Sequence, residues 1–266
     1  MMVRALALAL LGAALAGCGS STPRREELPQ PQPQASQPAV PASPTERARV
    51  HTQLGASYYR IGQFDVALDE LKEALDADPK YVPAHNSLGL VYMGLRQDDK
   101  AKASFERALR IDRNDSDANN NYGLFLCDRK FEKESVRYFL AAIGNALYKS
   151  PWEAYVNAGI CTRRGGDEKT AEQYFQKALQ LQPNDARALI NLAQLYYQQS
   201  DLEKSSGALS RYMQIVQAPD ASALWLGVRM ERLLGDRNAM ASYSSQLRSR
   251  FPSAPETRAL NEGRFE

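Results

Sequence analysis

The stretch LGLVYMGLRQDDKAKASFERA, residues 88–108, contains a spacing of small and large side chains that recurs along most of the chain. Leu88 precedes Gly89, an aromatic residue follows at Tyr92, and the second half of the stretch contains Ala101 and Phe105. The same order returns about every 34 residues, which indicates an array of similar structural units. The corresponding first residues of the six copies are Leu54, Leu88, Tyr122, Ala158, Leu192 and Leu226.

This spacing resembles the tetratricopeptide pattern, in which each unit consists of two antiparallel helices. Small residues such as Gly89 and Ala101 are expected where the two helices come closest. The sequence therefore predicts an all-α fold, a right-handed superhelical solenoid of about six helix-turn-helix repeats with a concave groove. The repeats are expected at about 48–81, 82–115, 116–151, 152–185, 186–219 and 220–252, within a domain that spans 46–258 and precedes a C-terminal tail at 259–266.

The interval between the third and fourth copies is longer than the others by two residues. The additional residues fall around Asn145 to Pro151. We expect them either to loosen the turn at this place or to lengthen a helix.

The N-terminus has the layout of a secretory signal, with Arg4 followed by an apolar stretch and then Leu-Ala-Gly before Cys18. The apolar stretch, Ala5 to Ala16, is shorter than the roughly 18 residues that a membrane span needs. The ending resembles the bacterial lipobox, in which the cysteine is acylated, for example with palmitate, and becomes the first mature residue. An ordinary secretory signal that ends near a cysteine is the alternative.

We therefore expect a signal peptide at 1–17, lipid attachment at Cys18, and contact with the membrane through this anchor only. By resemblance to bacterial lipoproteins, Gly19 favours sorting to the outer membrane, on its periplasmic face. Residues 18–45 are rich in proline and glutamine, as in LPQPQPQASQPAVPASP at 28–44, and are predicted to be a disordered tether. A spacer without a binding role is favoured over a proline-motif ligand.

Composition and motifs argue for a binding scaffold and against an enzyme. The formal net charge of +2 offers no electrostatic basis for binding nucleic acid. No glycine-rich phosphate loop is present, and no Ser, Cys or Asp has an evident base beside it. No cofactor is expected. His51 and His85 occupy the same place in two adjacent repeats, so a metal or haem site is an alternative to two packing positions.

Two cysteines besides Cys18 lie in the repeat region, Cys127 and Cys161, in the first helices of neighbouring repeats. An even number of cysteines in an oxidising compartment suggests a bridge. A disulfide needs Cα atoms within about 7 Å, which is closer than most packed helices allow. The residues alone leave open a disulfide or two small buried thiols.

The concave groove is expected to be where a partner binds. The positions of the first helices that commonly face inward in this repeat family form an apolar stripe through the middle and C-terminal repeats. Such a stripe suits an amphipathic helix or an extended apolar peptide, unless the curved solenoid or the C-terminal segment covers it. These positions are Leu90, Met93, Leu124, Val156, Ile160, Ile190, Tyr197, Leu224 and Val228.

Three local stretches add to the lipobox, the tether and the six repeats: NNNYGLFLC at 119–127, NAGIC at 157–161 and LWLGVRMERLLGD at 224–236. Together they resemble the type IV pilus biogenesis lipoproteins of the PilF/PilW type, which are secretin pilotins. The resemblance covers roughly 46–258. It implies a non-enzymatic assembly factor that binds the secretin subunit and promotes its localisation to the outer membrane and its multimerisation. It also implies that Cys127 and Cys161 are paired, as in PilW-type members.

Other scaffold lipoproteins are the competing interpretation, such as a β-barrel assembly subunit or a peptidoglycan-hydrolase adaptor. A protein partner is expected in each case, and the solenoid itself is expected to be a monomer.

Overall fold

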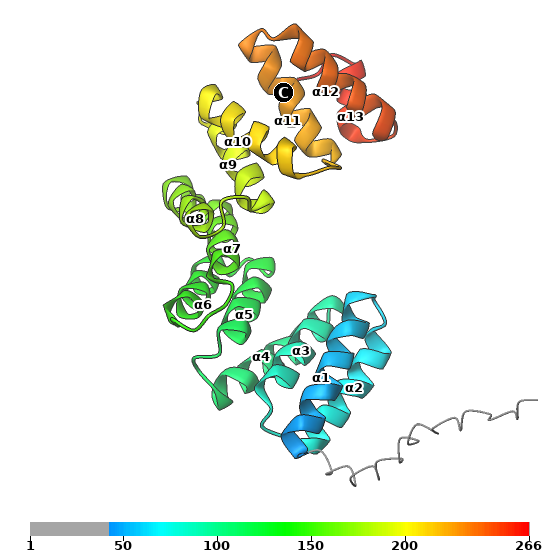
Figure 1. Cartoon of the computed structure of the whole chain (residues 1–266), viewed down its shortest axis with the longest axis vertical. Coiled ribbons are helices and arrows are strands. Elements are labelled where there is room, and N and C mark those ends of the chain that lie inside the picture. The colour runs from blue at the N-terminus through cyan, green and yellow to red at the C-terminus, as the bar shows by residue number, and fades with distance from the viewer. Residues whose placement is uncertain (1–42, 266) are drawn as a thin grey trace, which may run out of the picture. The chain divides into compact units, whose positions relative to one another are not determined.

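The computed structural model describes residues 43–265, and within them thirteen helices and no strand. Helices follow one another as antiparallel pairs, and the pairs stack into a right-handed superhelical solenoid (Figure 1). The first helices of the pairs are α1 (Pro44–Arg60), α3 (Val82–Gly94), α5 (Ser116–Asp128), α7 (Pro151–Arg164), α9 (Ala186–Gln198) and α11 (Ala221–Leu234). The second helices are α2 (Phe64–Ala77), α4 (Asp98–Ile111), α6 (Glu132–Gly144), α8 (Glu168–Leu181), α10 (Leu202–Ile215) and α12 (Arg237–Arg250). The all-α tetratricopeptide prediction is confirmed.

Aspartate side chains begin many of these helices. Asp185 is an example: its Oδ1 accepts a hydrogen bond from the backbone N–H of Ala188, at 2.8 Å. Such a cap satisfies one of the N–H groups that have no partner within the first turn of a helix. The same arrangement occurs at Asp115, Asp167, Asp201, Asp220 and Asp236.

The close approach of the two helices in a pair depends on a glycine in the first helix. A Cβ atom built on Gly89 would lie 2.5 Å from the ring of Phe105 on α4, and one on Gly159 would lie 2.6 Å from the ring of Phe175 on α8. Both rings are completely buried. The small residues of the repeat pattern are therefore required by the contact that holds each pair together.

Aromatic side chains join one repeat to the next. Phe105 of the second repeat stacks on Tyr122 of the third, with 5.7 Å between the ring centroids. Tyr122 in turn meets Tyr138 edge to face at 4.7 Å. Such pairs contribute about 0.5–1.5 kcal/mol beyond the burial of their area. The core is a series of these inter-repeat clusters along the solenoid, as is typical of repeat proteins.

The two additional residues between the third and fourth repeats lie in the connection, and neither helix is lengthened. Helix α6 ends at Gly144 and α7 begins at Pro151, which leaves residues 145–150 between them. The connection between α4 and α5 contains residues 112–115 only. Of the two expected outcomes, the looser turn is the one observed.

The expected boundaries at the two ends need correction. Helix α1 begins at Pro44, inside the predicted tether, because the Ser43 side chain accepts a hydrogen bond from the N–H of Glu46 and caps the helix. At the other end, α13 (Pro255–Asn261) crosses the predicted start of a tail at residue 259. This helix contacts α11 and α12, and its Thr257 and Leu260 are buried.

The predicted signal peptide at 1–17, the lipid attachment at Cys18 and nearly all of the tether at 18–45 lie outside the described residues. Among the described residues, no helix combines the length and the apolar character that a membrane crossing requires.

Candidate partner-binding groove

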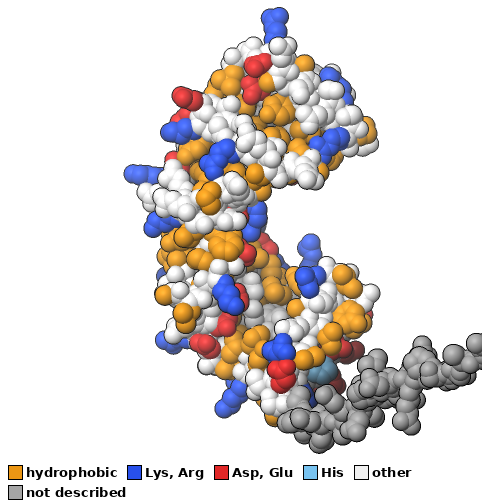
Figure 2. Space-filling view, in the orientation of Figure 1, with side chains coloured by type: hydrophobic (Ala, Val, Ile, Leu, Met, Phe, Trp, Pro, Cys, Tyr) orange, Lys and Arg blue, Asp and Glu red, His pale blue; other side chains and the backbone are white. Residues whose placement is uncertain are grey.

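The first helices of successive repeats contact one another and form the inner side of the curve. Contacts join α3 to α5, α5 to α7, α7 to α9, and α9 to α11. Figure 1 shows α5 and α7 on the inner side, with α6 and α8 on the outer side. In the space-filling view this side of residues 43–265 is hollowed, and Lys and Arg side chains border it (Figure 2).

Three of the nine residues predicted to line the groove are fully buried, so the continuous apolar stripe is wrong. Val156 has no exposed surface and belongs to the core cluster that it forms with residues of α8 and α9. Leu224 and Val228 also have no exposed surface, because they pack with Leu260 of α13 and with Phe265. The C-terminal segment thus covers this end of the stripe, which was one of the two alternatives.

The other six predicted residues are only partly buried and pack at the edges of the core clusters. They occur in two sets, one in the second and third repeats and one in the fourth and fifth. The first set is Leu90, Met93 and Leu124, and the second is Ile160, Ile190 and Tyr197.

Between these apolar residues runs a row of side-chain amides that joins neighbouring first helices. The Asn121 amide donates to Oδ1 of Asn86 at 3.1 Å, and the Asn157 amide donates to Oδ1 of Asn120 at 3.0 Å. Arg187 of α9 donates a hydrogen bond to Oδ1 of Asn157. The amides link α3 to α5 and α5 to α7, and Arg187 extends the row from α7 to α9, so polar groups that the apolar pattern did not predict lie between the first helices.

A small cavity of about 200 Å³ lies between α9 and α11, next to the predicted groove residue Tyr197. Its most unusual member is Arg229, whose guanidinium lies over the rings of Tyr197 and Trp225, at 4.9 Å and 5.7 Å from their centroids. The Nε atom of Arg229 is inaccessible to solvent and has no hydrogen-bond partner among the described residues. Gln194, Gln198, Ser222 and Leu226 complete the lining.

Sequence reasoning missed Arg229, together with Arg163 and Arg187 on the preceding first helices. The residues chosen were the apolar ones at the inward-facing positions of the first helices. Arg163 lies at one of these positions, 34 residues before Tyr197, and Arg187 lies at another, but both were left out because they are charged. Arg229 directly follows the predicted Val228, and its only sequence signal is that a basic residue recurs on the consecutive first helices α7, α9 and α11.

Cys127 and Cys161 lie together in the structure, with their Cα atoms 5.9 Å apart, a separation that permits a disulfide. Both side chains are buried in a cluster with Phe139 and Ala158. The adjacent first helices α5 and α7 therefore approach closely enough for a disulfide, which the sequence alone did not establish.

The two histidines have separate partners. Nδ1 of His51 is 2.8 Å from a carboxylate oxygen of Glu70, and Nε2 of His85 is 3.1 Å from the carbonyl oxygen of Pro79. Within residues 43–265 no cluster of three or more His, Cys, Asp or Glu side chains could hold a metal ion. The described residues thus offer no support for the metal or haem alternative.

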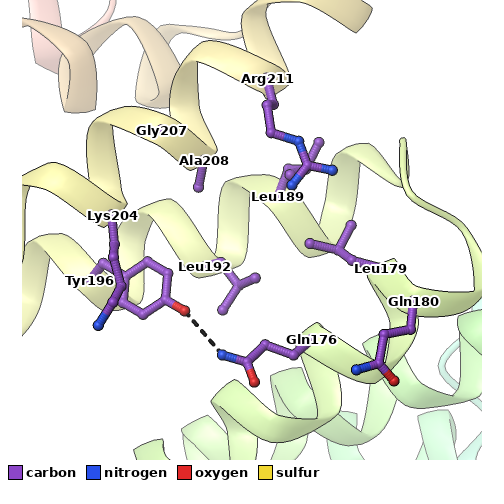
Figure 3. A pocket seen from close by; sticks show the side chains of 10 residues that line it. All are labelled: Gln176, Leu179, Gln180, Leu189, Leu192, Tyr196, Lys204, Gly207, Ala208 and Arg211. Carbon is purple, nitrogen blue, oxygen red and sulfur yellow. Dashed lines mark hydrogen bonds between the residues drawn. The ribbon is translucent and has the colours of Figure 1, made fainter.

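A cavity of about 570 Å³ lies between α8 and α10 and over α9, on the side of the second helices (Figure 3). Leu189 and Leu192 of α9 lie beneath it, and Lys204 and Arg211 of α10 are at its edge. Similar hollows of about 450 Å³ and 410 Å³ lie between α4 and α6 and between α10 and α12. The hollow recurs because second helices of successive repeats diverge, so it is a feature of the stacking and not a distinct site.

Comparisons with known proteins agree with this architecture. The family described as tetratricopeptide repeat matches residues 82–115, 133–186 and 164–225, and the family described as TPR repeat matches 55–95. The chain is 28% identical to the "Type IV pilus assembly protein PilF" of Pseudomonas aeruginosa over 257 residues, which are 96% of this chain and 97% of that protein.

Two solved structures are similar over most of their length. One is described as PilW, a "widely conserved type IV pilus biogenesis factor": it is 32% identical, with a TM-score of 0.73, and the match covers 80% of this chain and 97% of that one. The other is Pseudomonas aeruginosa PilF, with 27% identity, a TM-score of 0.77, and coverage of 83% and 99%. With its repeats, its fold and these similarities, the chain belongs to the PilF/PilW-type family of tetratricopeptide repeat proteins of type IV pilus biogenesis.

Proposed function

We propose that the protein is a non-enzymatic lipoprotein of the outer membrane that binds the secretin subunit of the type IV pilus machinery. By this binding it promotes localisation of the secretin to the outer membrane and its multimerisation, and hence pilus biogenesis. The observation that carries the proposal is the similarity to PilF and PilW, which spans 97% or more of the length of those proteins.

Each part of the chain has its own role in this proposal: anchoring, connection or partner binding. An acyl anchor at Cys18 holds the protein at the periplasmic face of the outer membrane, and the proline-rich segment connects the anchor to the solenoid. The solenoid offers a concave surface of partly buried apolar residues, amides and arginines to a segment of the secretin subunit. Tetratricopeptide scaffolds are generally binding proteins, so neither a cofactor nor a nucleic acid is required for this role.

The periplasm is oxidising, and we propose that Cys127 and Cys161 form a disulfide there. Their separation of 5.9 Å between Cα atoms supports the bridge. A covalent link between α5 and α7 would hold the third and fourth repeats together although the connection between them, residues 145–150, is longer than the regular spacing.

The test is the amount of SDS-resistant secretin multimer in outer-membrane extracts from wild-type, deletion and Cys18→Ala strains. We expect the multimer to be lost in the deletion strain and to be mislocalised in the Cys18→Ala strain. Unchanged multimer in both strains would rule out the secretin role. The other scaffold roles, in β-barrel assembly or with a peptidoglycan hydrolase, would then be tested by affinity capture with the wild-type chain.

The groove is tested separately by charged substitutions at Leu124, Ile160 and Ile190, which are partly buried and lie on the first helices. We expect Leu124→Glu, Ile160→Glu and Ile190→Glu to weaken capture of the secretin while circular dichroism still reports a folded helical protein. Unchanged capture by all three variants would exclude the concave face and direct attention to the outer side of the solenoid.

A further inference from the structure

Three arginines on the first helices of the last three repeats have no carboxylate partner among residues 43–265. They are Arg163 of α7, Arg187 of α9 and Arg229 of α11. Seven ion pairs occur within residues 43–265, and none of them includes these three side chains. Arg129 shows the contrast, because its guanidinium pairs with both carboxylate oxygens of Asp98, at 2.6 Å and 2.5 Å.

Among the described residues, each of the three arginines contacts neutral groups, at least one of them on an adjacent first helix. Arg163 donates long hydrogen bonds of 3.4 Å to the carbonyl oxygen of Asn191 and to Oε1 of Gln194. Arg187 donates to the amide oxygen of Asn157. Arg229 lies over the rings of Tyr197 and Trp225.

The charge of Arg163 is poorly compensated. Burial lowers the pKa of its guanidinium, the neighbouring Arg164 lowers this pKa further, and Glu168 raises it only in part without forming an ion pair. Arg163 is half-buried, and partial burial of a cation that lacks a carboxylate partner has a cost that an anionic ligand would reduce. This position therefore favours the arrival of an anionic group.

The strongest indication of a ligand is at Arg229. Its side chain lines the cavity of about 200 Å³ together with Gln194, Gln198 and Ser222, so charged and polar groups meet in one place. The guanidinium is planar, and its N–H groups match the two oxygens of a carboxylate. The amide and hydroxyl groups beside it can bind the backbone of the same ligand.

The three positions are arranged in sequence along the inner surface. Their contacts bridge α7 to α9 and α9 to α11. Packed helices lie about 8–10 Å apart, and an extended chain advances about 3.3 Å per residue, so a short extended segment can cross the three helices and pass all three arginines.

We infer that the concave surface formed by α7, α9 and α11 binds an extended, acidic segment of the protein partner. The occupant is thus defined by carboxylates and an extended backbone, and not by an apolar helix face. This inference rests on the proposed function, because it assumes that the groove binds a protein, and it adds the chemical character of the segment that is bound.

The direct test is fluorescence anisotropy with the detergent-solubilised mature lipoprotein and a short fluorescein-labelled peptide in which Asp alternates with Thr. The control peptide replaces each Asp with Asn. We expect the acidic peptide to bind, its affinity to fall as salt is raised, and the Asn peptide to bind at least about tenfold more weakly. Equal binding of the two peptides would overturn the inference.

A pair of matched variants separates the site from overall charge. The groove variant is Arg163→Gln with Arg187→Gln and Arg229→Gln. The control variant is Arg137→Gln with Arg237→Gln and Arg258→Gln, which removes the same charge from exposed positions on α6, α12 and α13. The groove variant should lose about tenfold or more in affinity for the acidic peptide, and the control variant less than about twofold. Equal losses would show attraction by net charge and overturn the inference.

If the groove variant loses helical circular dichroism and is therefore misfolded, the single variant Arg229→Lys is tested in its place. Lysine keeps the charge but lacks the planar fork, so binding should still weaken by about threefold or more. Unchanged binding of Arg229→Lys would overturn the role assigned to Arg229.

Anionic vesicles containing phosphatidylglycerol complete the experiment. Vesicle binding that depends on the three arginines, with no peptide binding, would replace the protein segment with a lipid surface and overturn the inference. Specific peptide binding combined with unchanged secretin multimers in the deletion strain would have a different meaning. The groove would still be assigned to an acidic segment, and only the secretin would be excluded as the source of that segment.

Discussion

The guanidinium of Arg229 lies over the ring of Tyr197, with 4.9 Å between its Cζ atom and the ring centroid. The two residues belong to consecutive first helices, α11 and α9. Tyr197 therefore acts as a positioning residue, because contact with its ring holds the Arg229 guanidinium beside the cavity. This relationship connects a residue that the repeat pattern selected with one that it did not.

Removal of the platform should weaken the groove without removing the charge. We expect Tyr197→Ala to lower the affinity for the acidic peptide by about threefold to tenfold, because Arg229 loses a cation–π contact worth about 0.5–1 kcal/mol and its orientation. Tyr197→Phe keeps the ring and should bind as the wild type does. Anisotropy titrations of both variants check the prediction, and equal affinities of Tyr197→Ala and Tyr197→Phe would contradict it.

The bridge between Cys127 and Cys161 should stabilise the solenoid. It closes a loop with a sequence separation of 34 residues, and the entropy removed from the unfolded chain corresponds to about 3–4 kcal/mol. Urea unfolding with and without dithiothreitol measures this difference. The double variant Cys127→Ala with Cys161→Ala is the control, and its unfolding midpoint should not respond to the reductant. A wild-type midpoint that is equally insensitive would mean that the bridge is absent or contributes nothing.

Two glycines should respond to alanine in opposite directions. Gly89→Ala places a methyl group 2.5 Å from the buried ring of Phe105, so we expect a loss of about 1–3 kcal/mol in the free energy of unfolding. Gly207 lies within α10 and has no atom within 4 Å of a built Cβ. Gly207→Ala should therefore stabilise the helix by about 0.5–1 kcal/mol.

Thermal or urea denaturation distinguishes these two effects. A second variant tests the cause at Gly89, because Gly89→Ala combined with Phe105→Leu should recover part of the loss if the ring is the obstacle. Destabilisation by both single substitutions would show that helix context, and not the Phe105 contact, controls the response.

The short C-terminal helix should be needed to close the last repeat. Leu260 of α13 is buried against the cluster that contains Leu224 and Val228. We expect Leu260→Ala to cost about 2–3 kcal/mol and to increase hydrogen exchange in α11. Arg258→Ala, on the exposed side of the same helix, is the matched control and should change neither quantity by much. Faster exchange confined to α13 would mean that this helix does not protect the repeat.

Much of the fold followed from one repeated contact. Small residues such as Gly89 and large ones such as Phe105 recur at intervals set by the geometry of a helix pair, so the number of repeats could be read from the chain. The site was predicted less well: Tyr197, Ile160 and Ile190 are partly open, whereas Val156, Leu224 and Val228 are buried. The pattern identifies the side of a helix, but exposure depends also on what lies against that side.

The amino-acid sequence by itself specified the helix pairs, because each repeat contains the small and large side chains that bring its own two helices together. Only the tertiary structure decided which inward positions stay open. Leu224 and Val228 are covered by α13 and Phe265, which belong to a segment outside the repeat pattern. Arg229 becomes a candidate ligand-binding residue because it packs on Tyr197 of the preceding repeat. Contacts between repeats join residues that no local spacing relates, and their packing and charge balance exist only after the repeats have stacked.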